Sequence, residues 1–286
     1  MKYLLQILIL LLTFSSCIKN NPTPTWLEIQ PWKIQENGTN NEEDLTSTSF
    51  TDAYVIIDNK IIGFFELPIK LPILLTGELN IEIYPVIHNN GISSTKKVYP
   101  FCNSYKTKKL FSSGNEISIS PITSYKTETN FWVEDFEVAS SKLQTGADYS
   151  TNLFSLTTDK SAVKYGNQCA KVQLTQKDTV WFGKTLSNLI LPKGKDIYLE
   201  MDYKNELNIL TGILSYSEVD GFKFNPNIRV NAQPLAQMKW KKIYIELKEI
   251  VSYSVRASKF ETYFRIALPT SKSEGIVYLD NLKIVY

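Results

Sequence analysis

Ile-Val-Tyr-Leu-Asp-Asn-Leu-Lys-Ile-Val-Tyr, residues 276–286, closes the chain with a run of β-branched and aromatic residues without glycine or proline. Such residues favour strands over helices. Runs of the same kind occupy residues 196–204, 240–247 and 260–267, and the second ends in strict alternation of apolar and polar residues. Alternation marks a half-buried strand, and no helical period competes with it. Several short strands with turns between them predict an all-β chain built from β-sandwiches.

The composition favours strands and gives no sign of binding to nucleic acid or to an anionic membrane surface. The chain of 286 residues holds 16 Tyr, 14 Phe and 5 Trp, and its formal net charge is only +2. Lys and Arg form no block along the chain. A balanced charge without a basic block gives no footprint for nucleic acid or for an anionic membrane surface.

Two stretches differ in pattern, with a polar connector at residues 121–129 between them. In the first, residues 26–125, apolar runs at 53–57 and 61–65 flank Asp58-Asn59, which predicts a hairpin because Asn tolerates left-handed backbone geometry. Residues 79–85 alternate as a half-buried strand, and 99–101 and 116–119 are expected to close the sheet. The second predicted domain spans 126–286.

The N-terminus reads as an export signal. Lys2 precedes an apolar run at residues 3–12 and small residues before Cys17, which is typical of a signal peptide over residues 1–16. The run is too short to span a bilayer, which takes about 20 apolar residues. Residues 17–25 are then a polar tether. An ordinary signal peptide that ends by chance on a cysteine is the alternative.

Two resemblances concern the first part of the chain. Phe14-Ser15-Ser16-Cys17 resembles the lipobox of bacterial lipoproteins, here of a Bacteroidetes type. It implies that Cys17 is acylated and anchors the protein in the outer membrane, on the periplasmic face or the cell surface. Residues 54–85, with strand, Asp-Asn turn, Ile-Gly, prolines and an alternating strand, resemble a PEGA-type module. That resemblance implies a small extracytoplasmic β-sandwich that supports or spaces other parts.

The second part resembles the galactose-binding-like jelly roll of many carbohydrate-binding modules. The matching motifs are Asp-Phe-Glu at 135–137, Gly-Asn-Gln-Cys-Ala-Lys-Val at 166–172, Trp-Lys-Lys at 240–242 and Tyr-Leu-Asp-Asn-Leu-Lys at 278–283. The resemblance implies that the first and last strands lie side by side. It also implies a structural calcium ion held by Glu137, Asp280 and carbonyl groups near Gly166-Asn167, and oxygen ligands are those that calcium prefers. Exposed carboxylates on edge strands are the alternative.

A carbohydrate-binding module stacks aromatic rings on sugar faces and places a few polar groups beside them. The segment after Ile213 offers such residues, which we expect on an exposed loop. The predicted ligand-binding residues are Tyr216, Phe222, Phe224, Arg229 and Asn231. Trp181, by contrast, lies in an alternating strand, which predicts a core position.

Catalytic chemistry has little support in the sequence. The single histidine, His88, precedes Asn-Asn-Gly, where a solvated turn residue is expected. Nucleophile-elbow, phosphate-loop and His-Glu-x-x-His motifs do not occur. Of the three cysteines, Cys102 and Cys169 fall in different predicted domains, so two buried free thiols are expected.

The sequence therefore predicts a non-catalytic envelope lipoprotein that presents a glycan- or protein-binding β-sandwich. A structural or assembly lipoprotein, which contacts partner proteins of the outer membrane without binding sugar, is the alternative.

Overall fold

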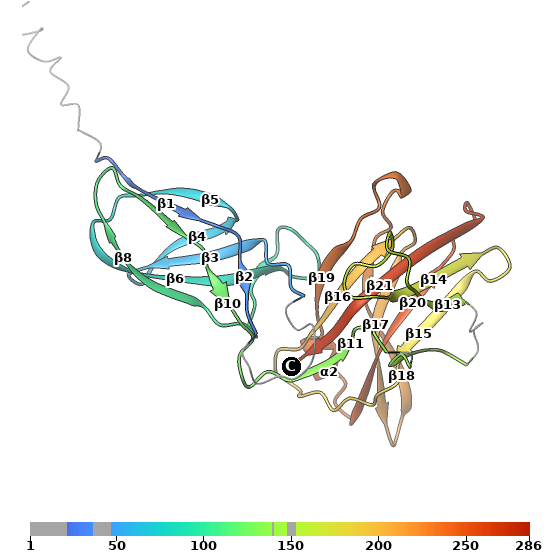
Figure 1. The fold of residues 1–286 in the computed structure, drawn as a ribbon. Coiled ribbons are helices and arrows are strands. Elements are labelled where there is room, and N and C mark those ends of the chain that lie inside the picture. The colour runs from blue at the N-terminus through green and yellow to red at the C-terminus, as the bar shows by residue number, and fades with distance from the viewer. Residues whose placement is uncertain (1–21, 37–46, 139, 148–152) are drawn as a thin grey trace, which may run out of the picture.

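The structure, a computed structural model, describes residues 22–36, 47–138, 140–147 and 153–286. Its elements are almost all strands, so the predicted all-β class is confirmed. Figure 1 shows the strands in two groups that lie side by side, one blue to green and the other yellow to red. Among the described residues, no helix has the length and apolar character needed to cross a membrane.

The N-terminal half is the span of the first ten strands. They are β1 (Thr25–Ile29), β2 (Lys33–Ile34), β3 (Asp52–Ile57), β4 (Lys60–Glu66), β5 (Ile69–Ile73), β6 (Gly77–His88), β7 (Lys96–Val98), β8 (Tyr105–Phe111), β9 (Glu116–Ile119) and β10 (Ile122–Thr123). One sheet has the order β4-β3-β6-β7, with β8 also paired to β6, and β5-β1-β9 and β10-β2 form smaller sheets. Buried apolar residues of β1, β3 and β6 form the core between them.

The predicted hairpin at Asp58-Asn59 is confirmed. Both residues have positive φ, at 45° and 61°, and join β3 to β4 as a two-residue loop. Such loops match the right-handed twist of the strands that they connect. The predicted closure of this sheet by residues 99–101 and 116–119 is wrong. Residues 99–101 form no strand, and β9 pairs in parallel with β1 in the other sheet.

His88 does not lie in a solvated turn but ends β6. Its Nε2 atom is 3.0 Å from Oδ2 of the fully buried Asp52, which also pairs with Lys96. Burial acts to raise the pKa of Asp52, but hydrogen bonds from Lys96 and Thr51 and the nearby charges lower it overall. The chain's single histidine therefore lies beside a buried carboxylate at the end of a strand.

The C-terminal half holds the remaining elements. They are β11 (Phe131–Glu134), β12 (Leu143–Thr145), β13 (Phe154–Thr157), β14 (Cys169–Thr175), β15 (Val180–Thr185), β16 (Tyr198–Asn205), β17 (Ile209–Ser217), β18 (Gly221–Val230), 3₁₀ helix η2 (Leu235–Gln237), β19 (Lys241–Glu246), helix α2 (Lys248–Tyr253), β20 (Lys259–Ala267) and β21 (Glu274–Val285). One sheet has the order β13-β14-β21-β16-β19, with β11 also paired to β21, and the other has the order β12-β15-β20-β17-β18.

The two sheets of the C-terminal half pack face to face as a β-sandwich around one large core. The closing strand β21 pairs with β14 and β16 and, antiparallel, with the opening strand β11, where Glu134 lies opposite Leu282. The prediction that the first and last strands of this half lie side by side is therefore confirmed. Trp181 is fully buried in this core, as predicted, and Cys102 and Cys169 are buried free thiols.

A third core joins the two halves. Aromatic residues from the N-terminal half, Phe50, Tyr99 and Tyr125 among them, pack against Tyr198 and Tyr244 of the C-terminal half. Tyr99 lies edge-on to both Tyr198 and Tyr244, with ring centroids 5.5 and 5.3 Å apart. The predicted boundary between residues 125 and 126 falls in the connector between β10 and β11.

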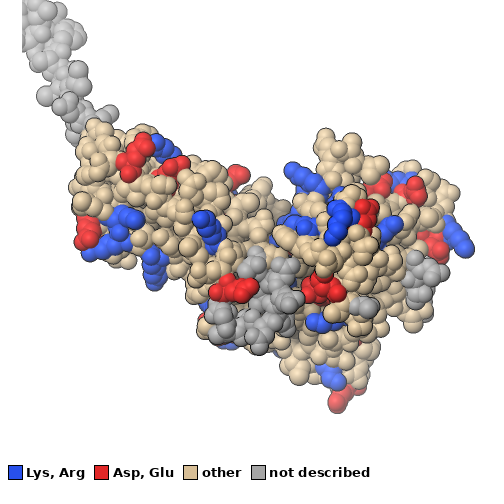
Figure 2. Space-filling model, in the orientation of Figure 1, with Lys and Arg blue, Asp and Glu red and all other residues tan. Residues whose placement is uncertain are grey.

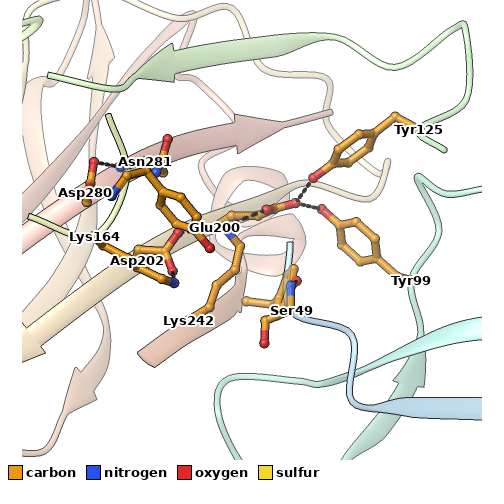
Figure 3. A network of polar contacts seen from close by, with 11 residues as sticks. Ser49, Tyr99, Tyr125, Lys164, Glu200, Asp202, Lys242, Asp280 and Asn281 are labelled. Atoms are coloured by element: carbon orange, nitrogen blue, oxygen red, sulfur yellow. Dashed lines mark hydrogen bonds and ion pairs between the residues drawn. The ribbon is translucent and has the colours of Figure 1, made fainter. Parts of the chain in front are cut away.

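A buried carboxylate lies at the centre of this shared core (Figure 3). Glu200 on β16 is fully buried, and its Oε1 atom accepts hydrogen bonds from the hydroxyls of Tyr99, at 2.5 Å, and Tyr125, at 2.7 Å. The ammonium of Lys242 lies 3.3 Å from Glu200 Oε2 and 3.1 Å from Asp202 Oδ2. Burial alone would raise the pKa of Glu200, but the charges of Lys242 and Lys283 and the two tyrosine hydroxyls lower it.

We predict that Tyr99→Phe destabilises the protein by about 1–3 kcal/mol, because it removes one donor from a buried carboxylate and leaves the cavity shape unchanged. Urea unfolding of the purified protein measures the difference. Tyr253→Phe is the matched control, since that side chain is 79% exposed and should change stability by less than about 0.5 kcal/mol. Equal stability of the two variants would contradict the prediction.

Candidate functional site

The segment predicted as a loop after Ile213 is a β-hairpin. Strands β17 and β18 pair across a turn at residues 218–220, with Tyr216 opposite Phe222 and Leu214 opposite Phe224. The Ser217 hydroxyl accepts a hydrogen bond of 2.9 Å from the Asp220 amide and closes the turn. The predicted aromatic residues therefore lie at the edge of a five-stranded sheet and not on a free loop, as was expected.

The hairpin contributes to an aromatic cluster on the outer face of that sheet. We call it the aromatic face and define it by Phe182, Tyr216, Phe222, Phe224 and Tyr263. Phe182 stacks on Tyr263 with centroids 5.4 Å apart, and Phe224 lies edge-on to both rings at 5.7–5.8 Å. Tyr216 contacts Phe222 at 4.9 Å. The rings of Phe222 and Phe224 remain 55% and 59% exposed, so they form the part that a ligand can reach.

Strand alternation and one glycine place this cluster. Along β15, Trp181 and Gly183 face the core, so Phe182 and Lys184 face outward. Gly212 lies opposite Tyr263, and a Cβ atom at this position would be 2.3 Å from Tyr263 Cζ. A side chain at position 212 would therefore displace the tyrosine ring that supports Phe182 and Phe224.

A shallow hollow of about 340 Å³ lies over the aromatic face, with Phe182, Leu214, Phe222 and Phe224 in its lining. Lys184 reaches its edge, 5.7 Å from the Phe222 ring centroid, and forms an ion pair of 2.7 Å with Glu261. Of the described residues that line the hollow, only Lys184 is ionisable. The arrangement suits binding of a flat apolar surface with polar edges and offers no acid–base pair over the rings.

The other two predicted ligand-binding residues lie apart from this hollow. Beyond a bulge in the pairing of β17 and β18, Arg229 lies opposite Leu210, and Asn231 follows the end of β18. Both line a separate groove next to the N-terminal half. The structure thus brings Tyr216, Phe222 and Phe224 together and places Arg229 and Asn231 at a second location.

The carboxylates predicted to hold calcium both contact the turn at residues 165–168. Glu137 accepts hydrogen bonds from the amides of Asn167, at 2.9 Å, and Gln168, at 3.1 Å, and from the Asn167 side chain. Burial acts to raise the pKa of Glu137, but these donors lower it overall. Asp280, 1% exposed, lies 3.4 Å from the Tyr165 amide nitrogen.

These contacts do not fit a calcium ion. The turn presents N–H donors to Glu137, where a calcium ion needs oxygen ligands. No group of three or more His, Cys, Asp or Glu side chains suited to a metal occurs within the described ranges. In this conformation the turn offers no oxygen ligand between Glu137 and residues 167–168, and calcium binding stays a prediction that rests on the resemblance alone. The other predicted site residue, Cys17, lies outside the described residues.

Sequence reasoning missed Tyr263, Lys184 and Glu261 as parts of the site. Tyr263 and Glu261 sit on β20, and Lys184 on β15, and only the pairing of these strands with each other and with β17 brings them beside the hairpin. The one sequence signal was the run of β-branched and aromatic residues at 260–267, which indicated a strand but not its neighbours.

Figure 2 shows Lys and Arg interspersed with Asp and Glu over both halves of the visible face, in keeping with the balanced composition. On the described part of that face, charged side chains of one sign therefore do not form one large patch. Recognition must come from local sites.

Comparison with known proteins gives matches among solved structures alone, since no family model and no curated protein matches the chain. The CBM22-1 xylan-binding domain of Paenibacillus barcinonensis Xyn10C is 12% identical, with a TM-score of 0.38, and the match covers 54% of this chain and 91% of that one. The TmCBM61 structure in complex with β-1,4-galactotriose is 11% identical, with a TM-score of 0.32, over 50% and 86% of the two chains. A structure from a study of carbohydrate-binding modules of the β-sandwich superfamily is 12% identical, with a TM-score of 0.38, over 92% and 98%. These solved structures to which the chain is similar are thus carbohydrate-binding modules.

Proposed function

We propose that this protein is a non-catalytic envelope lipoprotein whose aromatic face binds a glycan. The observation that carries the proposal is the exposure of Phe222 and Phe224 on a sheet face next to the Lys184–Glu261 ion pair. A contiguous patch of exposed apolar side chains on a protein surface often marks a binding site. The buried partners Phe182 and Tyr263 fix the position of the Phe224 ring before any ligand arrives.

The chemistry of a sugar ring matches this surface. The C–H groups of a pyranose carry a small positive charge, and the face of a phenyl ring carries the negative part of its quadrupole. Sugar hydroxyls both donate and accept hydrogen bonds, so the Lys184 ammonium and the Glu261 carboxylate suit them at the edge. The hollow of about 340 Å³ lies at the lower end of the usual range for small-molecule sites.

The proposed anchor is the acylated thiol of Cys17, with residues 18–25 as a spacer. β1 begins at Thr25, whose buried hydroxyl donates a 2.7 Å hydrogen bond to the Ser112 carbonyl, so the spacer ends one residue earlier than predicted. In this proposal the N-terminal half holds the aromatic face away from the membrane.

We predict that Phe222→Ala combined with Phe224→Ala weakens glycan binding at least tenfold, because the sugar loses both exposed rings. Calorimetric titration against neutral β-linked oligosaccharides that the wild-type protein binds measures the loss. Ile190→Ala, at a side chain that is 77% exposed outside the aromatic face, is the matched control and should bind as wild type.

Unchanged glycan binding in the double variant would contradict the proposed site. Absence of glycan binding by the wild-type protein, together with a co-purifying envelope protein that the double variant no longer retains, would favour the assembly lipoprotein instead.

We predict that metabolic labelling with a clickable fatty acid marks the wild-type protein and leaves Cys17→Ser unmarked, because the thiol is the acceptor. In-gel fluorescence after export measures the label. A labelled Cys17→Ser variant, or an unlabelled wild type, would refute the anchor and leave the glycan site unaffected.

Calcium is tested by thermal melting of the mature protein with calcium and with a chelator. A bound ion stabilises the folded state according to its concentration relative to its Kd. Because N–H groups face Glu137, we expect the same melting midpoint in both buffers. A midpoint that rises by several degrees with calcium and no longer does so in Glu137→Gln would show that the turn rearranges around the ion.

A further inference from the structure

A second hollow lies at the far end of β18 from the aromatic face, where the two halves meet. It is a groove of about 930 Å³ between the turn at residues 90–92 of the N-terminal half and β18, β19 and the segment 231–239 of the C-terminal half. We call it the basic groove. Its polar side chains include Asn90, Arg229, Asn231, Gln237, Lys239 and Lys241.

The groove carries positive charge. Arg229, Lys239 and Lys241 line it, and no acidic side chain is among its described lining residues. None of these three cations forms an ion pair with another described residue. Two carboxylates on the adjoining strands β19 and β16 are already paired, Glu246 with Lys97 at 2.7 Å and Asp202 with Lys242 at 3.1 Å. An anionic group that enters the groove therefore meets cations whose charge is not neutralised by described neighbours.

The walls of the groove are held in place by hydrogen bonds. The Asn90 amide donates to the Tyr244 carbonyl at 2.8 Å, and Asn90 Oδ1 accepts from the Glu246 amide at 2.9 Å, so the turn of the N-terminal half is fixed on β19. On the opposite wall, the side chain of Gln233 is 6% exposed and hydrogen-bonds to the backbone of Lys239. Its Oε1 atom accepts from the Lys239 amide at 3.2 Å, and its Nε2 atom donates to the Lys239 carbonyl at 3.0 Å. A preformed groove avoids the entropy cost of ordering its walls when a ligand binds.

We propose that the basic groove binds an acidic saccharide, with its carboxylate on Arg229 and Lys241. A guanidinium donates two parallel hydrogen bonds to a carboxylate. The side-chain amides of Asn231 and Gln237 both donate and accept, as sugar hydroxyls do. Ile92 and the side chain of Ile243 supply apolar surface for the sugar ring.

This site is separate from the aromatic face, and either can exist without the other. Phe222 and Phe224 do not line the basic groove, and Arg229 does not line the hollow over the rings. Both lie on β18, so one strand presents a neutral surface near its start and a cationic groove at its end.

The test uses the full mature chain and calorimetric titration. The probes are short oligomers of galacturonate, glucuronate and mannuronate, each compared with its methyl ester, which keeps the sugar and removes the charge. We expect binding of at least one acid, at least tenfold weaker binding of its ester, and a Kd that rises with salt, because exposed charges are screened. Arg229→Gln combined with Lys241→Gln should weaken acid binding at least tenfold without a change in melting midpoint.

Lys223→Gln is the matched control, since it removes an exposed lysine of the same strand outside the groove and should leave the Kd within twofold. Phe224→Ala should also leave acid binding intact, which separates this site from the aromatic face. Equal binding of acid and ester, an unchanged Kd in the Arg229 and Lys241 variant, displacement of the sugar by an equal concentration of inorganic sulfate, or no binding of any acid would each overturn the proposal.

Discussion

The carboxylate of Glu200 is fully buried, and its hydrogen-bond donors come from across the boundary between the two halves. Tyr99 and Tyr125 of the N-terminal half donate to it, while Lys242 of its own half balances the charge. Removing one partner of a buried charge typically costs about 3–5 kcal/mol, far more than an exposed pair is worth. Separation of the halves would expose the apolar rings of the shared core to water, so aromatic packing and the Glu200 hydrogen bonds together hold the halves as one unit.

The contacts between the two halves shape the surface of the protein as well as its core. The turn at residues 90–92 hydrogen-bonds to β19, and the fixed position of this turn forms one wall of the basic groove. Gly91 permits the approach, because it has a φ of 72° and a Cβ atom there would lie 2.9 Å from Ile243 Cδ1. The contacts that hold the N-terminal half against β16 and β19, the shared aromatic core and the Glu200 network among them, therefore also position this wall of the basic groove.

The sequence predicted those features that local pattern controls. The Asp58-Asn59 hairpin, the inward position of Trp181 and the strands near residues 198–205 and 274–285 follow from residue type and alternation. Alternation also places Glu200 on the face opposite Met201, which for a lone sandwich is the solvent face. The N-terminal half covers that face, and no pattern within residues 196–204 reveals a cover supplied by residues about 100 positions away.

The candidate site was predictable only in part, because local pattern indicates its exposed residues but not the strands that pack beside them. Phe222 and Phe224 were predicted on an exposed loop, and Pro226, shortly after them in the sequence, is a residue that argues against a central strand. Proline lacks an amide donor and is tolerated on an edge strand, and β18 is the edge of its sheet. Between Pro226 and Arg229 the strand carries a bulge, which increases local twist. The residues before the bulge therefore join the aromatic face, and those after it turn toward the N-terminal half, so neighbours in sequence come to serve two surfaces.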